Sequence, residues 1–371
     1  MCLYIGYKKP FVAKSDITVY KYVSKNNGKY YTACRHYPVN TNEVMKPDKK
    51  GDIGWKADNK YCIYGGVIHA CTTTFDNGFG SKICLRAVIR KGTEFYIQDD
   101  LKQVAAKELY ITDEEVTDKR STDLTEYLED AINNAESGND GVKIGYYRLS
   151  NGNFVNPFEY KEGTIIGVVA FFDKNSNPVS IGVKSERLPW LKKMFFNKVS
   201  SDILYDDTVE DMDGMRHTKD ILSKKTYDPN IFVAVEYCNT YSTEGTKPGD
   251  WYMPAIGEWV KITQNMLIIN MSLSKSGFAM FDMSSTLWSS SECCVWADPQ
   301  SWYCDMYTGA CYMVSYGRLY SGCACPCLSF IDEKCEWSLF SIYCVSDLFI
   351  NKSYRIMRHL QCSKYITRII K

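Results

Sequence analysis

The side chains that could do chemistry are concentrated between Cys293 and Cys344, where nine of the 16 cysteines lie. Thiolates act as nucleophiles and as zinc ligands, and a C-x-C-x-C run occupies 323–327. Structural zinc sites use two pairs of ligands, so three thiols on one face of a strand fit tetrahedral coordination poorly. None of the four histidines lies in this segment to act as a general base. Buried thiols are therefore favoured over zinc or a catalytic cysteine, and we expect neither an enzyme nor a cofactor.

Two other groups of polar residues have simpler explanations than catalysis. His69 lies in an expected strand without accompanying ligands, which favours a hydrogen-bonded core or edge histidine. An acidic cluster over 206–213 lacks the glycine and terminal glutamate of a calcium loop, which favours a solvated loop over a cation site. Its members are Asp206, Asp207, Glu210, Asp211 and Asp213.

The 288–330 stretch differs in composition from the rest of the chain. From 293 to 331 there is no Lys, Glu or Asn, and the charged residues are Asp298, Asp305 and Arg318, whereas 24% of the whole chain is charged. Tyr, Trp, Ser and Gly take their place. Binding loops use these residues because aromatic rings supply rigid contact area at low entropic cost. The stretch is therefore predicted to form a binding face.

Strand alternation divides the side chains of 301–307 between two faces. The inward face holds Trp302, Cys304 and Met306, and the outward face holds Tyr303, Asp305 and Tyr307. A turn at Thr308 and Gly309 leads into a return strand, 311–316, whose outward residues are Tyr312, Val314 and Tyr316. A last strand is predicted over 324–330, with Pro326 at an edge or bulge.

Periodicity over the rest of the chain predicts an α+β protein with two domains. Residues 1–135 are predicted to form a smaller β-rich domain that ends in a helix over 122–135, followed by a linker at 136–141. Residues 141–330 form the second domain. For the basic tail, 331–371, a solvated helix is favoured over a nucleic-acid contact. Further predicted strands are 17–23, 29–36, 60–70, 83–92, 94–98, 142–150, 164–172, 178–183 and 287–291; predicted helices are 228–241 and one that begins at Pro254.

Net charge and the N-terminal segment bear on partners and location. The 44 basic and 44 acidic residues cancel, so no global charge directs the chain to nucleic acid or a membrane surface. The N-terminus lacks the features of a signal peptide, and no stretch approaches the roughly 18 apolar residues that span a bilayer. We therefore expect cytoplasmic synthesis without membrane insertion, and the place of action, a virion or a cell surface, stays open.

Four separated motifs resemble a known family: WYMPAIGEW, WSSSE, SWYCDMYTG and CACPCLSF, in this order. With the upstream GTIIGVVAFF, they are similar to C-type-lectin-fold domains of gut bacteria and their phages over about residues 141–330. Several members are variable proteins of diversity-generating retroelements, in which adenine-directed mutagenesis alters Asn-rich codons near the C-terminal end of the fold. The resemblance implies a C-type-lectin-like domain with a varied ligand-binding surface.

The resemblance also assigns individual positions. The implied scaffold residues are Trp251, Pro254, Gly257, Glu258, Trp288, Ser289, Ser290, Glu292, Trp302, Gly309 and Pro326. The predicted ligand-binding residues are Cys293, Cys294, Trp296, Asp298, Gln300, Tyr303, Asp305, Tyr307, Tyr312, Ser315, Tyr316, Arg318 and Tyr320. The outward face obtained from strand alternation is the face that the family varies.

The chain departs from the family pattern at several cysteines. Cys325 replaces an arginine, which removes a buried ion-pair or hydrogen-bond anchor and puts the stability of the last strand in doubt. Cys304, Cys311 and Cys327 stand where the family has valine, and cysteine can serve as a small buried hydrophobe. The Glu-Pro-Asn and Trp-Asn-Asp signatures of calcium-binding lectins are absent.

The sequence therefore predicts calcium-independent, non-enzymatic binding of a protein or glycan on a cell surface. The alternative is a structural phage or surface-appendage component in which the lectin-like domain mediates assembly.

Overall fold

The structure, a computed structural model, describes most of the chain up to residue 329. The described residues are 3–32, 37–47, 55–57, 59–63, 66–74, 83–192, 210–225, 227–295, 298–315 and 322–329. For 55–57, 293–295, 298–300 and 313–315 only the backbone is described. The predicted tail, 331–371, lies outside these residues.

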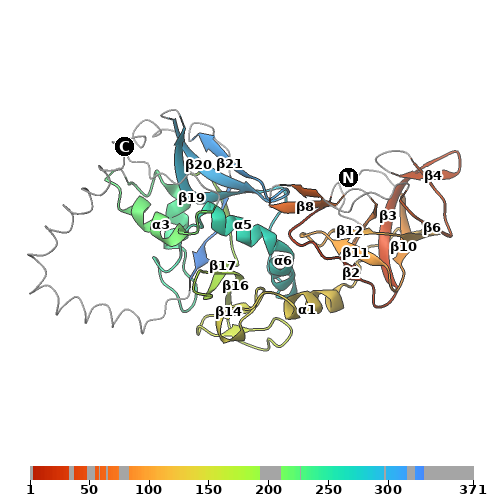
Figure 1. Cartoon of the computed structure of the whole chain (residues 1–371), viewed down its shortest axis with the longest axis horizontal. Coiled ribbons are helices and arrows are strands. Elements are labelled where there is room, and N and C mark those ends of the chain that lie inside the picture. The colour runs from red at the N-terminus through yellow and green to blue at the C-terminus, as the bar shows by residue number, and fades with distance from the viewer. Residues whose placement is uncertain are drawn as a thin grey trace, which may run out of the picture. The chain divides into compact units, whose positions relative to one another are not determined.

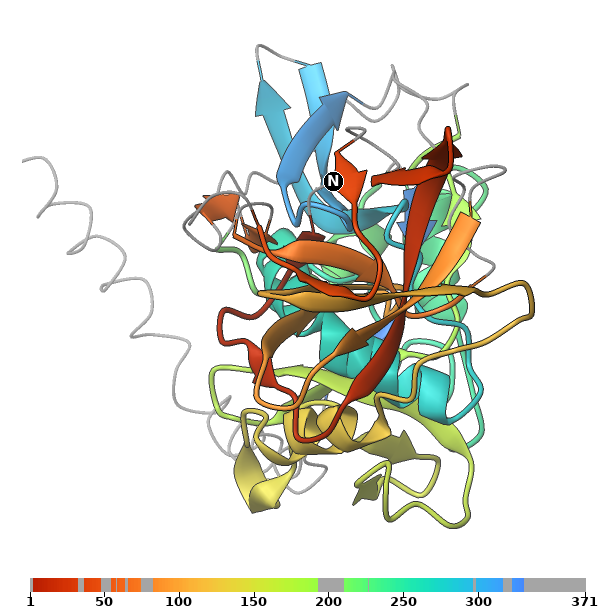
Figure 2. The ribbon, with the colours of Figure 1, turned by 90° about the vertical axis from the view of Figure 1, so that its right-hand side faces the viewer.

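The N-terminal residues form strands whose apolar side chains face a common core. In β3 (Ile17–Asn26), Ile17, Val19 and Val23 are buried in this way. The other strands of this sheet are β2 (Phe11–Val12), β4 (Lys29–Thr32), β5 (Pro38–Val39), β6 (Glu43–Met45), β9 (Ile68–Cys71), β10 (Ile83–Ile89), β11 (Glu94–Ile97), β12 (Gln103–Ala106) and β13 (Leu109–Glu115). They make a ten-stranded antiparallel sheet in the order β2-β11-β12-β9-β3-β10-β13-β6; β4 pairs with β3 beside this path, and β5 pairs with β4 (Figure 2).

A second, small sheet comes from the same half of the chain. It consists of β1 (Leu3–Ile5), β8 (Lys60–Ile63) and β7 (Trp55–Ala57), in the order β1-β8-β7. The predicted single strand at 60–70 is therefore wrong, because β8 and β9 belong to different sheets. Glycines at 65 and 66 separate them, and Gly66 has a φ of 65°, a backbone conformation that interrupts a strand.

The predicted hairpin near residue 27 is confirmed. β3 pairs with β4, and the turn between them has positive φ at both central residues, 48° at Asn27 and 76° at Gly28. Asn-Gly favours this mirror-image turn because its backbone twist matches that of paired strands.

The rest of the described chain contains two further sheets, each of five strands. Their strands are β14 (Tyr147–Leu149), β15 (Phe154–Val155), β16 (Ile165–Phe172), β17 (Pro178–Gly182), β18 (Glu186–Leu188), β19 (Thr286–Val295), β20 (Asp298–Asp305), β21 (Cys311–Ser315), β22 (Gly322–Ala324) and β23 (Cys327–Leu328). One sheet has the order β15-β14-β16-β17-β23, and the other β18-β22-β19-β20-β21. The pairing of β17 with β23 brings the start and the end of this region side by side (Figure 1).

Five α-helices lie among the described residues: α1 (Thr125–Asn133), α3 (Gly214–Leu222), α4 (Val233–Thr240), α5 (Ile256–Gln264) and α6 (Met266–Lys275). A short 3₁₀ helix, η1, spans Asn139–Gly141. The helices predicted at 122–135 and 228–241 are present as α1 and α4 within shorter bounds. The helix predicted to begin at Pro254 is two helices, α5 and α6, that meet at Asn265. No helix was predicted at the position of α3.

Helix α6 is apolar on more than one side and joins two cores. Met266, Ile269 and Leu273 pack in the core between the two five-stranded sheets, whereas Leu267 and Met271 pack in the core of the N-terminal sheet. Because two faces of α6 are apolar, the helix packs against the N-terminal sheet on one side and against the core between the five-stranded sheets on the other, as its place between them shows (Figure 1). The described residues up to 329 accordingly belong to one compact unit of mixed α+β structure.

Candidate functional site

Both faces predicted for β20 are present. Trp302, Cys304 and Met306 lie in the core between the sheets, each at most 7% exposed. On the opposite face Tyr303 pairs with Tyr312 of β21, with ring centroids 5.5 Å apart. Tyr312 is 47% exposed and Tyr303 is half-buried. The described part of this face is thus an exposed tyrosine that contacts a half-buried one.

Helices α3 and α4 explain why Tyr303 is only half-exposed. Trp288 of β19 pairs with Tyr303, and its ring meets the tyrosine edge-on with centroids 6.1 Å apart. Trp288 is itself buried in a cluster with Trp190 and with Phe232, the residue before α4, and α3 adds Ile221 to that cluster. The same face of the sheet is therefore covered at β19 and opens toward β21. We name the open part, Tyr303 with Tyr312, the tyrosine face.

Asp305 and Tyr307 have partners within the chain that strand alternation cannot reveal. Oδ1 of Asp305 accepts hydrogen bonds from the backbone N–H and the hydroxyl of Thr308, at 2.7 and 2.8 Å. Tyr307 is 36% exposed, and its ring centroid lies 4.7 Å from that of Tyr4 in β1. Asp305 therefore helps to close the turn, and Tyr307 shares its surface with the N-terminal half.

The other predicted ligand-binding side chains are not described. The backbone of Cys293, Cys294, Asp298, Gln300 and Ser315 lies in β19, β20 and β21, at the end of these strands away from the 306–309 turn. Trp296, Tyr316, Arg318 and Tyr320 lie outside the described residues. The strand register thus places these five positions on β19, β20 and β21, farther from the turn than Tyr303 and Tyr312.

A buried ion pair supports the tip of the hairpin from the N-terminal half. Lys60 of β8 and Asp99 are both fully buried, and Nζ lies 2.8 Å from Oδ2. Lys60 Nζ also donates to the carbonyl oxygen of Met306 at 2.7 Å. Asn59 donates to the carbonyl oxygen of Gly309, also at 2.7 Å. Lys60 in β8 and Asn59 in the turn before it thereby hold the turn between β20 and β21 in place.

Gly309 is required by both backbone and packing. Its φ is 71°, and a Cβ there would lie 2.9 Å from Cγ of Lys60. Gly309→Ala should therefore lower the free energy of unfolding by more than the about 1 kcal/mol that left-handed backbone alone costs. Gly28→Ala is the matched control, because Gly28 has a φ of 76° and nothing within 4 Å. Urea denaturation of both variants tests this; equal losses would show that the Lys60 contact contributes nothing.

The scaffold positions implied by the resemblance are all buried. Among them, Glu258 accepts the N–H of Ala255 at 2.8 Å and the hydroxyl hydrogen of Tyr252 at 3.0 Å. It thereby caps the start of α5 from the third helical position. Glu292 forms a buried ion pair with Lys224 just after α3, with Nζ and Oε2 2.5 Å apart. The pair between Glu292 and Lys224 holds the end of α3 on β19, and the cap formed by Glu258 fixes the start of α5.

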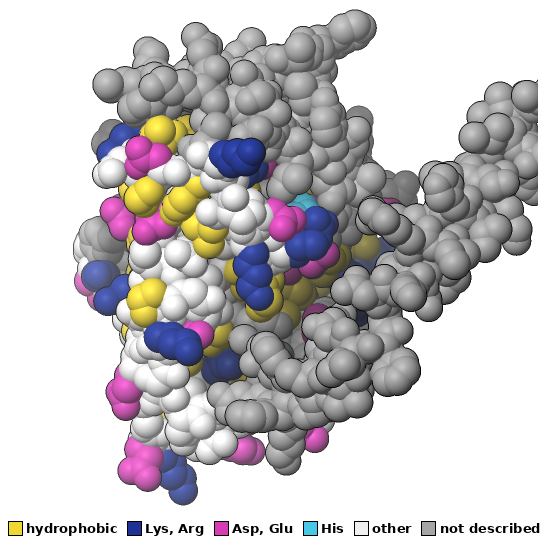
Figure 3. Space-filling model, turned by 90° about the vertical axis from the view of Figure 1, so that its left-hand side faces the viewer, with side chains coloured by type: hydrophobic (Ala, Val, Ile, Leu, Met, Phe, Trp, Pro, Cys, Tyr) yellow, Lys and Arg dark blue, Asp and Glu magenta, His cyan; other side chains and the backbone are white. Residues whose placement is uncertain are grey.

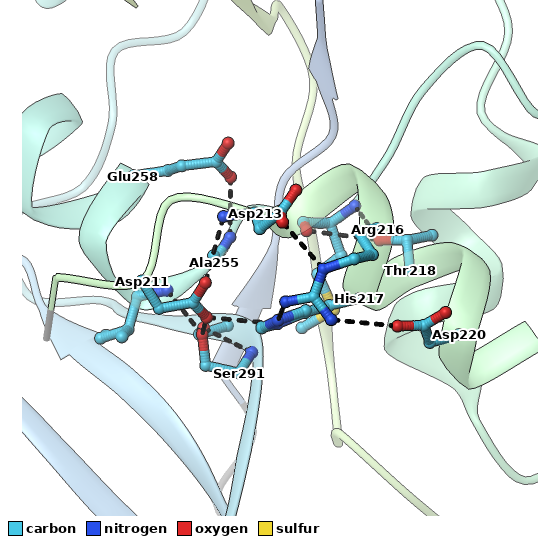
Figure 4. A network of polar contacts seen from close by, with 12 residues as sticks. Asp211, Asp213, Arg216, His217, Thr218, Asp220, Ala255, Glu258 and Ser291 are labelled. Atoms are coloured by element: carbon cyan, nitrogen blue, oxygen red, sulfur yellow. Dashed lines mark hydrogen bonds and ion pairs between the residues drawn. The ribbon is translucent and has the colours of Figure 1, made fainter. Parts of the chain in front are cut away.

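Asp211 is a buried anchor, so the prediction of a solvated acidic loop is wrong for this residue. One carboxylate oxygen accepts the hydroxyl hydrogen of Ser291 and lies 3.2 Å from Nδ1 of His217 (Figure 4). The carbonyl oxygen of Asp211 accepts the N–H of Gly257 at 2.7 Å. The Ser291 hydroxyl and the Gly257 N–H are buried and need hydrogen-bond partners, and the loop before α3 supplies them through Asp211. Asp206 and Asp207 lie outside the described residues.

Ser291, His217 and Asp211 are the three residue types of a Ser-His-Asp catalytic triad, but they are not arranged as one. A nucleophilic serine donates to the imidazole, which the carboxylate orients from its other side. Here the carboxylate lies between the two, and Nε2 of His217 faces the guanidinium of Arg216 at 3.0 Å. Ser291 is fully buried and accepts the N–H of Ile256 at 2.9 Å. The cluster therefore joins α3, α5 and β19.

His69 differs from the prediction of a hydrogen-bonded histidine. Neither ring nitrogen has a hydrogen-bond partner among the described residues. Burial, together with the charge of Lys21, lowers the pKa of His69 to about 3, so the ring is neutral. Lys21 Nζ instead donates to the backbone carbonyl oxygen of His69, at 2.6 Å. A neutral unpaired ring costs far less than a buried charge.

The predicted strand over 324–330 is two strands in two sheets, which separates the three alternating cysteines. Cys323 in β22 pairs with Arg187, and Cys327 in β23 pairs with Ile181. The chain changes sheets at Pro326, which has no N–H to contribute to a ladder. The prediction that all three thiols lie on one face of a single strand is therefore wrong. No group of three or more potential metal-ligating side chains occurs among the described residues.

Cys325 stands where the resemblance implies an arginine. Cys325 is fully buried, and burial raises the pKa of its thiol well above the usual value. Arg148 on β14 donates to the carbonyl oxygens of Leu328 and Ser329, both at 3.2 Å. The guanidinium of Arg148, on a strand that β16 and β17 separate from β23, therefore holds the last described residues.

The surface beside α3 shows charges of both signs interspersed among its described side chains (Figure 3). No helix that the structure describes is long and apolar enough to cross a bilayer. No family model, curated protein or solved structure matches this chain.

Proposed function

We propose that this chain is a non-enzymatic ligand-binding protein that presents the tyrosine face on a C-type-lectin-like domain, for a protein or glycan target on a cell surface. The single observation that carries the proposal is the half-exposed Tyr312, held against Tyr303 on a hairpin whose other face is core. Exposed aromatic residues on a rigid support lose little entropy on binding.

The surroundings of the tyrosine face support this function. Inward residues of the hairpin pack between two sheets, its tip is held by Lys60 and Asn59, and β19 is fixed by α3 and α5. Sites on strands with locked neighbours keep their geometry better than sites on loops. Of the positions that the resemblance assigns to the ligand, Cys293, Cys294, Asp298, Gln300 and Ser315 have their backbone in β19, β20 and β21.

The four motifs further suggest that this face is diversified by a retroelement. The proposal requires a near-repeat of the codons for 288–330 in the neighbouring DNA, differing at adenines, beside a reverse transcriptase gene. Sequencing of that region tests it. Absence of the repeat would overturn diversification and leave the proposed binding face standing.

The alternative is a structural phage or surface-appendage component in which the lectin-like domain mediates assembly. Tyr307, at the tip of the hairpin, is already packed against Tyr4 of the first strand. The lectin-like domain thus uses part of its tip for contacts within the chain. Recovery of the protein as a stoichiometric part of a purified particle, with no binding to cells, would favour this alternative.

The double variant Tyr303→Ala/Tyr312→Ala tests the proposed function. Fluorescently labelled protein would be applied to immobilised glycans and to intact bacterial cells, and binding to any positive surface would be titrated. Because aromatic hot spots contribute about 2 kcal/mol or more, we expect at least about a 30-fold loss of affinity.

Tyr37→Ala is the matched control for surface tyrosine loss. Tyr37 is 47% exposed, as is Tyr312, but it lies in the N-terminal half beside β5. The Tyr37→Ala variant should bind as well as the unmodified protein. If the double variant also binds as well as the unmodified protein, the tyrosine face is not the site.

A further inference from the structure

The base of the hairpin turn holds two free thiols that face each other across the strands. Cys304 of β20 and Cys311 of β21 are directly opposite in the antiparallel register, and both are unpaired thiols. The next pair toward the turn is linked by a hydrogen bond from the N–H of Asp305 to the carbonyl oxygen of Ala310, at 2.8 Å. Hydrogen-bonded and non-hydrogen-bonded pairs alternate along antiparallel strands, so the cysteines occupy a non-hydrogen-bonded pair.

That position has the spacing that a disulfide needs. Opposed residues in a non-hydrogen-bonded pair have Cα atoms about 4.5 Å apart, within the range of about 4.4–6.8 Å found for disulfides. The two thiols contact each other, and this contact, more than burial, raises the pKa of Cys304. Among the described residues of the last strands, Cys323 pairs with Arg187 and Cys327 pairs with Ile181, so neither lies opposite another cysteine.

The surroundings make the two thiols unequal. Cys304 is fully buried, whereas Cys311 is partly exposed and accepts a hydrogen bond from Nδ2 of Asn59 at 3.6 Å. An external oxidant can therefore reach Cys311 first. Cys304, already in contact with it, is then placed to complete the exchange.

We infer that Cys304 and Cys311 are a modification site, at which a low-molecular-weight disulfide converts the thiol pair into a cross-strand disulfide. The thiolate of Cys311 attacks one sulfur of the oxidant, which releases one thiolate and leaves a mixed disulfide. The thiol of Cys304 loses its proton to solvent, and its sulfur attacks Cys311, which releases the second thiolate. Two protein thiols are oxidised, one disulfide is reduced to two thiols, and the thiolates take up the two protons at neutral pH.

The disulfide would fasten the two strands directly beside the turn that Lys60 holds. In a reducing cytosol the pair stays as thiols, and it closes where the surroundings are oxidising. This site acts whether or not the tyrosine face binds a ligand, because it depends on the strand register alone.

Peptide mapping of the full chain tests the inference. Reduced protein is incubated with oxidised glutathione, the remaining thiols are alkylated, and protease digests are analysed by mass spectrometry. We expect a linked peptide that joins Cys304 to Cys311, formed before other linkages, and a melting temperature higher by roughly 5 °C than that of the reduced protein.

Two valine variants sharpen the result. Cys311→Val should abolish the linked peptide and the thermal shift, whereas Cys84→Val, at a buried thiol of the N-terminal sheet, should retain both. Recovery of both Cys304 and Cys311 in alkylated form after oxidation, or their linkage to other cysteines, would overturn the inference. The mapping of the unmodified chain decides this even if a variant does not fold.

Discussion

Lys60→Met is expected to lower the free energy of unfolding by about 3–5 kcal/mol at neutral pH, the cost of removing one partner of a buried ion pair. Lys60 and Asp99 are both fully buried, so the variant leaves a carboxylate without a countercharge and without water. It also removes the donor to the carbonyl oxygen of Met306. Equilibrium denaturation in urea measures the loss.

The dependence of this loss on pH identifies its cause. Burial raises the pKa of Asp99, and the charge of Lys60 opposes that rise. Without Lys60, the pKa of Asp99 in the folded protein rises further above its value in the unfolded chain. At low pH the Asp99 carboxyl of the variant is therefore neutral. Stability from a group with a raised pKa is present below the unfolded pKa and is lost as pH rises through the folded pKa. The deficit of Lys60→Met should therefore be smaller at pH 4 than at pH 7.

Two further variants serve as controls. Lys14→Met makes the same substitution at an ion pair with Asp130 whose side chains are 44% and 45% exposed, and it should cost far less than Lys60→Met because solvent screens an exposed pair. Lys60→Met combined with Asp99→Asn removes the unpaired charge and should recover a large part of the loss at pH 7. If Lys60→Met and Lys14→Met destabilise equally, the ion pair does not support the hairpin.

Glu258 should make the protein less stable as pH rises from 4.5 to about 8. Burial raises the pKa of Glu258 from 4.5 to about 8, although hydrogen bonds from Ala255 and Tyr252 favour the charged form. The neutral carboxyl therefore stabilises the fold fully below pH 4.5, and this contribution is lost as pH rises through 8. Each unit by which the folded-state pKa of Glu258 exceeds the unfolded value corresponds to about 1.4 kcal/mol. The free energy of unfolding should therefore fall by up to about 5 kcal/mol over this pH range.

Glu258→Gln isolates this contribution. The amide has the same shape, can accept the N–H of Ala255 and can donate to the oxygen of Tyr252, but it does not titrate. The difference in unfolding free energy between the variant and the unmodified protein should shift in favour of the variant by several kcal/mol between pH 5 and pH 8. Denaturation curves at a series of pH values measure it, and a constant difference would mean that Glu258 is charged throughout.

Local patterns in the sequence determined the hairpin that carries the tyrosine face. Alternation separated Trp302, Cys304 and Met306 from Tyr303 because each residue in a strand reverses the side-chain direction. Asn27 with Gly28, and Gly309, marked turns because their backbone angles are costly for other residues. These features depend on a few adjacent residues, which is why the sequence alone was sufficient for them.

The tertiary structure decided which side chains cover or support that hairpin. Lys60 lies 246 positions from Met306, and no pattern along the chain connects them. The cover over Trp288 comes from α3 and α4, and the change of sheet at Pro326 requires strands on both sides of it. Burial on one element follows from its own periodicity, whereas the choice of partner depends on how distant elements pack together. Only the folded chain therefore shows that Tyr312 is open, that Tyr303 is half-covered, and that Asp305 is occupied by its own turn.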